Sequence, residues 1–334
     1  MRNIKVDAST KAEIIDFLEN KVQDCKVLVI GDVMLDRYFY GNVTRISPEA
    51  PVPVNCIDRK KDTLGGAANV AHNLARLGCQ TYLAGAIGDD HHGRLLVRNL
   101  KKQGINTNGI IIGREKTTTK VRVLGGHQQM MRLDFEETDS VTLQAENELQ
   151  AYINAITEQG LNTIIISDYG KGICTEGICQ YAIRKAIEKS IPIMIDPKGT
   201  NWTKYRGASY ITPNVKETGE VLNFKLDNDT EILRNSAAEI KGKYNIETVI
   251  ITRSEKGISL FGNEEMTIPT VAQEVFDVSG AGDTVISGFA ATIGMDIKTQ
   301  TAVEFANFAA GIEVGKVGTY AVSKEEILTA LEQE

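Results

Sequence analysis

Strand patterns and helical patterns alternate along most of this 334-residue chain. Runs rich in β-branched residues predict strands within residues 26–36, 81–90, 162–172, 191–199, 209–217 and 247–257, with a hairpin partner at 257–262. Apolar residues at helical spacing predict helices at 9–22, 65–78, 93–104, 142–156, 177–190, 229–244, 301–318 and 323–333, and one more after Asp283. We expect Ser9 to cap the first of these helices. Such alternation builds a mostly parallel sheet between two layers of helices, so we predict a three-layer α/β protein.

Two β-rich segments do not fit this alternation. The first, residues 38–57, contains three prolines that a central strand does not tolerate: Pro48, Pro51 and Pro53. We therefore predict edge strands of a separate sheet there. The second, residues 115–135, is rich in β-formers around a Gly125–Gly126 turn, which predicts a hairpin. We expect insertions at about 36–57 and 115–135 to form one small lid on a single domain spanning residues 1–334.

Several of the predicted strands end in a carboxylate or an amide. These residues are Asp32, Asp89, Asp168, Asp196 and Asn214. Ligands of parallel α/β sheets bind beyond the carboxyl ends of the strands. The sequence therefore predicts a ligand site at this edge, beneath the lid.

The composition excludes some classes of partner. A net charge of −7 and a pI of about 5.4 disfavour nucleic acid and anionic membranes, although local positive charge can still bind a small anion. Five cysteines in a long chain do not suggest a disulfide scaffold. The charged N-terminus lacks the apolar run of a signal peptide, so we expect a soluble, cytoplasmic protein.

The segment DVSGAGDT, residues 277–284, places glycines and a carboxylate before a helical run. The backbone amides of Gly280, Ala281, Gly282 and Asp283 would form an anion cradle at the helix N-terminus. Asp283 beside that cradle could take a proton from an attacking hydroxyl, as phosphoryl transfer requires. Taken alone, the motif fits an Asp-capped turn equally well.

A second motif, GGAANVA at residues 65–71, lies far upstream. Gly65 and Gly66 would open a helix, and Asn69 could donate to and accept from sugar hydroxyls. Tight packing of the helix on the sheet would explain the same glycines. Neither motif is specific alone, but their occurrence in this order and at this separation in one chain is specific.

Together these motifs resemble the ribokinase-like carbohydrate kinase (PfkB) family, over about Lys26 to Gly318. The resemblance implies an ATP-dependent sugar kinase in which Asp283 is the catalytic base. It also implies that the amides of residues 280–283 hold the transferred phosphate. The segment NVKE resembles a family signature in which Asn214 and Glu217 organise Mg²⁺, often through water.

The nucleotide site is implied by the same resemblance. Thr252, Arg253 and Gly257 match a segment near the ribose and phosphates, and Asn307 matches a residue beside adenine. The chain has no Walker A motif, so nucleotide binding would not use a P-loop.

Further segments resemble heptose 7-phosphate kinases of lipopolysaccharide precursor synthesis: residues 29–54, LGGAANVAHNLARLG, QQMMRLDFE, SDYGKG and DPKG. This implies phosphorylation of D-glycero-D-manno-heptose 7-phosphate at the anomeric O1, giving the 1,7-bisphosphate on the route to ADP-heptose. The acids Asp32, Asp36 and Asp168 could bind sugar hydroxyls. The cations available for the sugar phosphate are Arg45, Arg122, Arg132, Lys171 and Lys198, of which Arg132, Lys171 and Lys198 are our candidates.

Other interpretations remain open at this point. Another sugar or sugar-phosphate kinase of the same fold fits the motifs, and so does a non-catalytic sugar-binding regulator. A dehydrogenase is disfavoured because GDVMLD, not Gly-x-Gly-x-x-Gly, follows the first strand. None of the four histidines forms a His-x-Gly-His motif, so we expect a kinase without a nucleotidyltransferase domain. Lid strands with exposed edges predict a homodimer through the lid.

Overall fold

The main sheet of the computed structural model has nine strands in the order β13-β12-β11-β10-β9-β8-β1-β4-β5. The structure describes residues 7–126, 128–272, 275–316 and 318–333. The nine strands are β1 (Lys26–Gly31), β4 (Gln80–Gly88), β5 (Asn106–Arg114), β8 (Thr163–Ser167), β9 (Ile193–Asp196), β10 (Tyr210–Ile211), β11 (Thr248–Thr252), β12 (Ile258–Phe261) and β13 (Glu265–Ile268). All neighbouring pairs from β11 to β5 are parallel, whereas the β11–β12 and β12–β13 pairs are antiparallel. The predicted mostly parallel sheet is confirmed.

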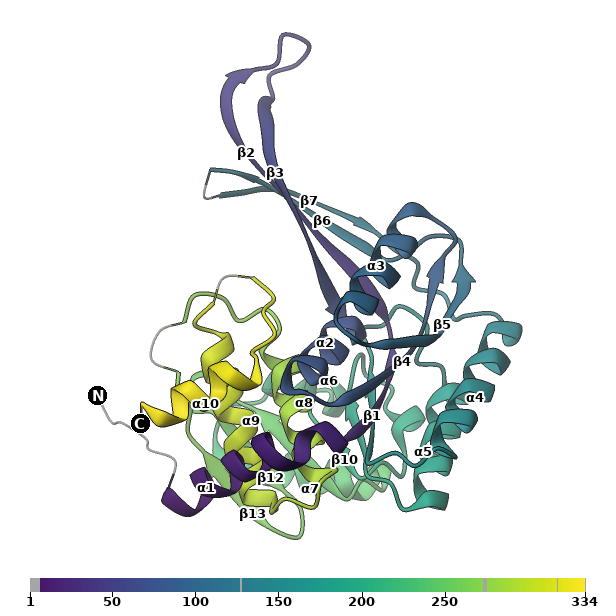
Figure 1. The fold of residues 1–334 in the computed structure, drawn as a ribbon, viewed down its shortest axis with the longest axis vertical. Coiled ribbons are helices and arrows are strands. Elements are labelled where there is room, and N and C mark those ends of the chain that lie inside the picture. The colour runs from purple at the N-terminus through teal and green to yellow at the C-terminus, as the bar shows by residue number, and fades with distance from the viewer. Residues whose placement is uncertain (1–6, 127, 273–274, 317, 334) are drawn as a thin grey trace.

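Helices cover both faces of this sheet (Figure 1). One apolar core includes side chains of α1 (Ala8–Asp16), α2 (Ala67–Leu77), α3 (His91–Lys102), α8 (Ala281–Ile293), α9 (Thr299–Glu313) and α10 (Lys324–Glu332). The second core includes side chains of α4 (Leu143–Thr157), α5 (Glu176–Lys189), α6 (Val215–Leu222) and α7 (Thr230–Tyr244). The three-layer architecture is therefore as predicted. Among the described helices, none combines the length and the apolar character that crossing a membrane requires.

A four-stranded sheet in the order β3-β2-β6-β7 stands beside the main sheet. Its strands are β2 (Val33–Ile46), β3 (Pro53–Gly66), β6 (Thr119–Gly125) and β7 (Gln128–Phe135). The β2–β3 hairpin projects far from the body of the molecule (Figure 1). We call this sheet the lid sheet. It contains the segments predicted to form the lid, and its strands β2 and β3 extend beyond the predicted bounds.

Some local predictions need correction. Asp7 caps α1 by accepting the amides of Ser9 and Thr10, so Ser9 is inside the helix. Strand β3 lies at the edge of the lid sheet, as predicted, but β2 lies between β3 and β6. The interior strand β2 contains none of the three prolines, because two fall in the turn and the third is the first residue of β3. Strands β5 and β13, which the sequence patterns did not predict, extend the main sheet at its two edges.

Candidate active site

Helix α8 begins at the predicted cradle. Gly280 is its N-cap with φ +105°, a conformation that favours glycine, and a Cβ there would also crowd Thr319 and Glu313 at 3.1 and 3.2 Å. The first amides of a helix have no acceptor within the helix, and the helix dipole makes this end attractive to anions. Apolar side chains of α8, including Ile286 and Phe289, are buried in the core and fix the position of the helix end.

Asp283 lies in the first turn of α8, and its side chain is almost fully buried. Its Oδ1 accepts a hydrogen bond of 2.6 Å from the Tyr169 hydroxyl, and its Oδ2 accepts one of 2.7 Å from Asn69 Nδ2. Burial raises the pKa of Asp283 to about 6, and the two hydrogen bonds oppose part of that rise. The group can therefore exchange a proton near neutral pH, as a general base should.

A cavity of about 160 Å³ opens in front of Asp283. The carboxyl ends of β8, β9, β10 and β11 and the start of α8 all reach it. Its lining includes eight residues predicted for the site: Asp168, Lys198, Asn214, Glu217, Thr252, Gly280, Gly282 and Asp283. Of the predicted strand-end residues, Asp32 and Asp89 do not line it; the exposed Asp89 side chain pairs with Arg94 instead.

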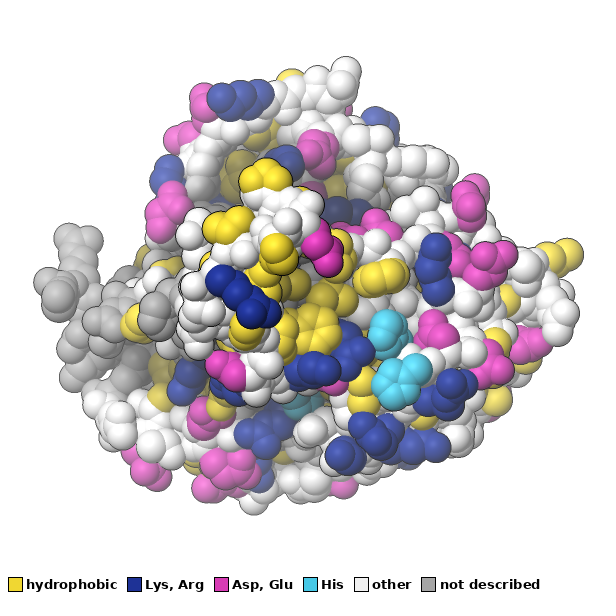
Figure 2. Space-filling model, turned by 90° about the horizontal axis from the view of Figure 1, so that it is seen from above, with side chains coloured by type: hydrophobic (Ala, Val, Ile, Leu, Met, Phe, Trp, Pro, Cys, Tyr) yellow, Lys and Arg dark blue, Asp and Glu magenta, His cyan; other side chains and the backbone are white. Residues whose placement is uncertain are grey.

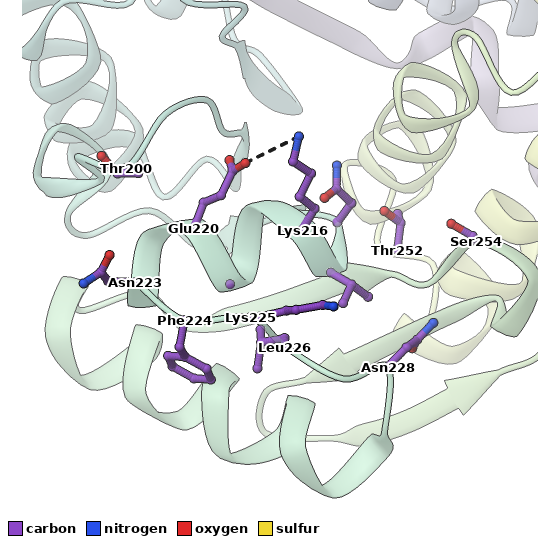
Figure 3. A pocket seen from close by; sticks show the side chains of 13 residues that line it. Thr200, Lys216, Glu220, Asn223, Phe224, Lys225, Leu226, Asn228, Thr252 and Ser254 are labelled. Atoms are coloured by element: carbon purple, nitrogen blue, oxygen red, sulfur yellow. Dashed lines mark ion pairs between the residues drawn. The ribbon is translucent and has the colours of Figure 1, made fainter.

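A second cavity of about 950 Å³ shares Asn214 and Thr252 with the first. It extends along α6, with Thr252 and Ser254 at one end and Asn223 and Phe224 at the other (Figure 3). This volume is within the range of small-molecule sites. The two cavities therefore meet at Asn214 and Thr252.

Of the four residues predicted to contact the nucleotide, only Thr252 lines the two cavities described above. The other three, Arg253, Gly257 and Asn307, have other contacts. Arg253 is buried, and its guanidinium donates to Asn228, Thr230 and Ser259, so its side chain holds the loop before α7. Gly257 adopts φ +83° next to the backbone of residues 268–270, where a side chain would not fit.

The last residue of that set, Asn307, is on α9 and donates 2.8 Å to the Pro269 carbonyl. Asn307 and Gly257 therefore both border the segment that begins at Ile268.

Asn214 and Glu217 form a capping box at the start of α6. Asn214 Oδ1 accepts the Glu217 amide, and Lys198 Nζ lies 3.0 Å from Glu217 Oε1. The neighbouring Asp196 has a pKa well above its usual value, because of burial and the charges of Asp283 and Glu217. Carboxylate and amide oxygens of this kind are ligands that Mg²⁺ takes, usually together with several waters. Asp196, which the sequence identified only as a strand end, lines the same cavity as Asn214 and Glu217.

Asp32 and Asp168 act on the loop that follows β8. Asp32 is buried, and its carboxylate accepts the amides of Tyr169, Lys171 and Ile173 at 2.8 to 3.1 Å. Asp168 accepts hydrogen bonds from Lys204, from the Tyr205 hydroxyl and from the Gly170 amide.

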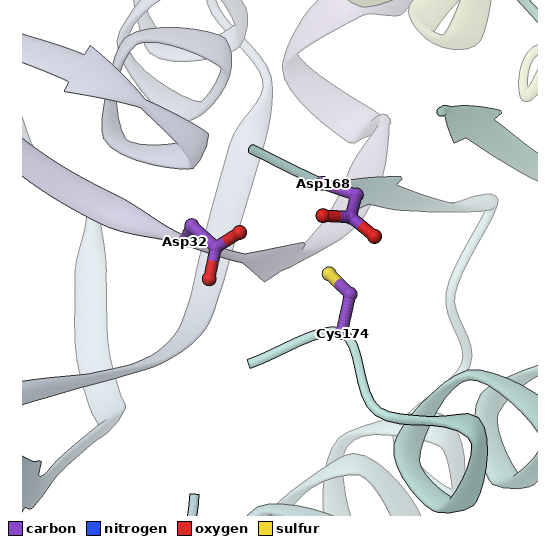
Figure 4. A group of neighbouring side chains, drawn as sticks. All are labelled: Asp32, Asp168 and Cys174. Carbon is purple, nitrogen blue, oxygen red and sulfur yellow. The ribbon is translucent and has the colours of Figure 1, made fainter. Parts of the chain in front are cut away.

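These two carboxylates point toward the Cys174 thiol (Figure 4). Because Asp32 and Asp168 are engaged by protein donors, the group is a brace for the loop and not an open metal site.

Two glycines at the end of β3, Gly65 and Gly66, allow strand β2 to pack closely beside them. A Cβ on Gly65 would collide with the Asp36 carboxylate, and Gly66 adopts φ +57° before α2. Asp36 in turn forms an ion pair with Arg122 of β6.

Cations gather on the side of the site that faces the lid sheet. Arg132 pairs with Asp134, and Lys171 pairs with Glu136. Arg45, in contrast, lies on the exposed outer part of β2, in the hairpin that projects away from the body. Lys120, which no sequence motif indicated, lies with its ammonium group 5.8 Å from the centre of the Tyr169 ring. Burial lowers its pKa, while the charge of Asp36 opposes that change.

Glu313, at the end of α9, is fully buried close to Gly280. Among the described residues, neither of its carboxyl oxygens has a hydrogen-bond partner. Burial, together with the charges of Asp277 and Asp283, raises the pKa of Glu313 to about 8. The group is therefore mainly protonated at neutral pH, and it adds no negative charge beneath the cradle.

Residues 24–326 match the family model of the pfkB family carbohydrate kinases. Relatives named bifunctional protein HldE are 42% identical over 96% of this chain in Syntrophotalea carbinolica and 43% identical over 92% in Haemophilus influenzae. The chain spans 66% and 64% of the length of these two relatives.

Solved structures share the fold. A ribokinase from Arabidopsis thaliana, complexed with ribose and ATP, has a TM-score of 0.71 at 18% identity, covering 92% of this chain and 98% of its own. Phosphofructokinase-2 from Escherichia coli, in complex with potassium, has a TM-score of 0.75 at 18% identity, covering 92% and 99%. These likenesses establish the ribokinase-like fold. With the match to the family model, they lead to one conclusion: the chain belongs to the pfkB family of carbohydrate kinases, phosphotransferases that act on a sugar hydroxyl.

Proposed function

We propose that this protein uses ATP and Mg²⁺ to phosphorylate D-glycero-D-manno-heptose 7-phosphate at its anomeric O1. The observation that carries the kinase chemistry is Asp283, held by two hydrogen bonds beside the amides of Gly280 to Asp283. The choice of heptose rests on the resemblance of residues 29–54 and the later segments to heptose 7-phosphate kinases.

In the proposed reaction, a carboxylate oxygen of Asp283 accepts the proton of the sugar O1 hydroxyl. The O1 lone pair forms a bond to the γ-phosphorus, and the bond from that phosphorus to the β–γ bridging oxygen breaks, releasing ADP. The amides at the start of α8 receive the negative charge of the transferred group. Asn214, Glu217 and Asp196 would hold Mg²⁺, partly through water, which would neutralise phosphate charge when bound.

Lys120 supports a phosphorylated sugar over a neutral one. Its ammonium group is partly buried above Tyr169, and within the described residues no carboxylate lies within ion-pairing distance of it. Arg122, Arg132 and Lys171 surround the same side of the site but already have acidic partners. We propose that Lys120 binds the sugar phosphate, and that Arg132 and Lys171 exchange their carboxylates for it.

Lys120→Met should raise the KM for the sugar phosphate by roughly 10- to 100-fold, since a hydrogen bond to a charged group is worth about 1.5–3 kcal/mol. The KM for ATP should change little. Lys60→Met on the outer strand β3, where Lys60 lies over Phe39, is the matched control. Steady-state kinetics with both substrates varied measures the effect. An unchanged sugar-phosphate KM would remove Lys120 from the phosphate subsite.

The substrate itself is tested by ADP release with sugar 7-, 6- and 5-phosphates, each as both anomers. We expect the heptose 7-phosphate to give the highest kcat/KM. A clear preference for a hexose 6-phosphate or a free sugar would assign the protein to another carbohydrate kinase activity of the same family. Failure to release ADP with any sugar would favour a sugar-binding regulator.

We further propose a homodimer formed through the lid sheet. Its outer part exposes apolar side chains of Ile46, Val52 and Met131, which are 52–63% accessible. Viewed from above, apolar side chains gather on this face of the molecule (Figure 2). Light scattering after size exclusion should give twice the 36.5 kDa chain mass, and Ile46→Asp should reduce it. A monomer at micromolar concentration would contradict this proposal.

A further inference from the structure

The loop after β8 contains Tyr169, a residue for which the sequence predicted no role. Tyr169 donates its hydroxyl to Asp283 Oδ1 at 2.6 Å, although the two residues are 114 positions apart. Asn69 donates to the other oxygen, Oδ2, at 2.7 Å. A carboxylate has about four lone-pair sites, so two donors leave room for a sugar hydroxyl. With both oxygens anchored, the plane of the Asp283 carboxylate is fixed before the substrate arrives.

The Tyr169 hydroxyl is held in place from several directions. The Asp32 carboxylate accepts the backbone amide of Tyr169 at 2.8 Å, as well as two further amides of the same loop. Asp168 is fixed by Lys204 and Tyr205 and accepts the Gly170 amide. The loop is therefore braced on both sides of Tyr169, and Lys120 lies over the ring.

The phenol is suited to donate and not to accept. Burial and the negative charge of Asp283 keep the pKa of Tyr169 well above its usual value, so the hydroxyl keeps its proton throughout the working range. A hydrogen bond to a carboxylate stabilises its charged form and lowers its pKa. The Tyr169 bond therefore offsets part of the rise that burial imposes on the pKa of Asp283.

We propose that Tyr169 is a positioning residue of the kinase, whose hydroxyl orients the Asp283 carboxylate toward the sugar hydroxyl and stabilises its charged form. This inference rests on the proposed role of Asp283 as the catalytic base. It assigns a function to the tyrosine of SDYGKG, a segment that carried only a resemblance in the sequence. It also explains why Asp32, a predicted sugar ligand, is instead directed at the backbone of this loop.

The test is the pH dependence of kcat in Tyr169→Phe. Loss of the donor should move the acidic limb of the profile up by about one pH unit, because a hydrogen bond to a charged group is typically that strong. Turnover should fall roughly tenfold at pH values below the limb and recover within a few-fold at alkaline pH. The other titratable groups that face Asp283 remain in this variant: Asp36, Lys120, Asp196 and Glu313.

Tyr205→Phe is the matched control. It removes a tyrosine hydroxyl that donates 2.6 Å to Asp168, within the same brace but not on Asp283. A purely structural role would give both variants the same loss of activity at every pH. The proposal predicts that only Tyr169→Phe moves the acidic limb.

A second substitution keeps the test independent of folding. Site-specific 3-fluorotyrosine at position 169 preserves the ring and makes the hydroxyl a stronger donor, so the limb should move to lower pH. An unmoved limb in both position-169 variants, with Asp283→Asn inactive, would overturn the role of Tyr169 and leave the base in place. An active Asp283→Asn enzyme would overturn both.

Discussion

Asp283→Asn should lower kcat by about 10³-fold, within the 10²- to 10⁴-fold range typical of a lost general base. The amide cannot take the proton from the sugar hydroxyl, but it retains the size and shape of the carboxylate. Tyr169 can still donate to the amide oxygen, and the Asn69 amide can turn to accept from the new NH₂ group. The measurement is ADP release at saturating ATP and sugar phosphate.

Binding and stability should survive this substitution. The side chain is buried and its charged form is disfavoured there, so removing the charge should leave the melting temperature equal or slightly higher. Calorimetric titration should give an ATP affinity close to that of the unmodified protein. Near-normal turnover in a well-folded Asp283→Asn protein would show that another group removes the proton.

Glu313→Gln should stabilise the protein strongly at alkaline pH. The folded-state pKa of Glu313 is about 8, against 4.5 for an ordinary glutamate, so the folded protein retains a proton that the unfolded chain releases. The stability of the unmodified protein should therefore decline as pH rises from about 4.5 to about 8, and then level off with respect to this group. The full effect is up to about 5 kcal/mol, and glutamine, which does not ionise, escapes it.

Thermal unfolding in one buffer series from pH 5 to pH 9 measures this difference. The two proteins should unfold at similar temperatures near pH 5 and separate progressively up to pH 8. Because the comparison is made between pH values, packing differences between the two side chains cancel. A constant gap, or none at any pH, would mean that Glu313 is ionised or solvated in the folded protein.

The repeated pattern of strand and helix was sufficient to predict the layers of the fold. Strands such as Lys26–Gly31 and Thr163–Ser167 are short apolar runs that a buried parallel sheet requires. Strand β5 was missed because its glycines break the pattern: Gly109 packs against the Tyr152 ring, where any side chain would collide. The need for a glycine there arises from Tyr152 on α4, more than forty residues later, so the sequence around Gly109 does not reveal it.

The candidate site was predictable where its chemistry lies within one motif. DVSGAGDT contains both the glycine needed at φ +105° and the acid in the first turn of the helix. The roles of Tyr169 and Lys120 were not predicted, and Asp196 was identified only as a strand end, because each of these side chains acts with a partner on a distant strand or loop. For the same reason Asp32, a plausible sugar ligand at a strand end, is committed to three backbone amides.

The most direct test of the account is a crystal structure of the full chain with heptose 7-phosphate and a non-hydrolysable ATP analogue. We expect one Asp283 carboxylate oxygen within about 2.6–3.2 Å of the anomeric O1, and the γ-phosphate at the amides of Gly280 to Asp283. A sugar bound with O1 beyond reach of Asp283, or a γ-phosphate away from the start of α8, would contradict it.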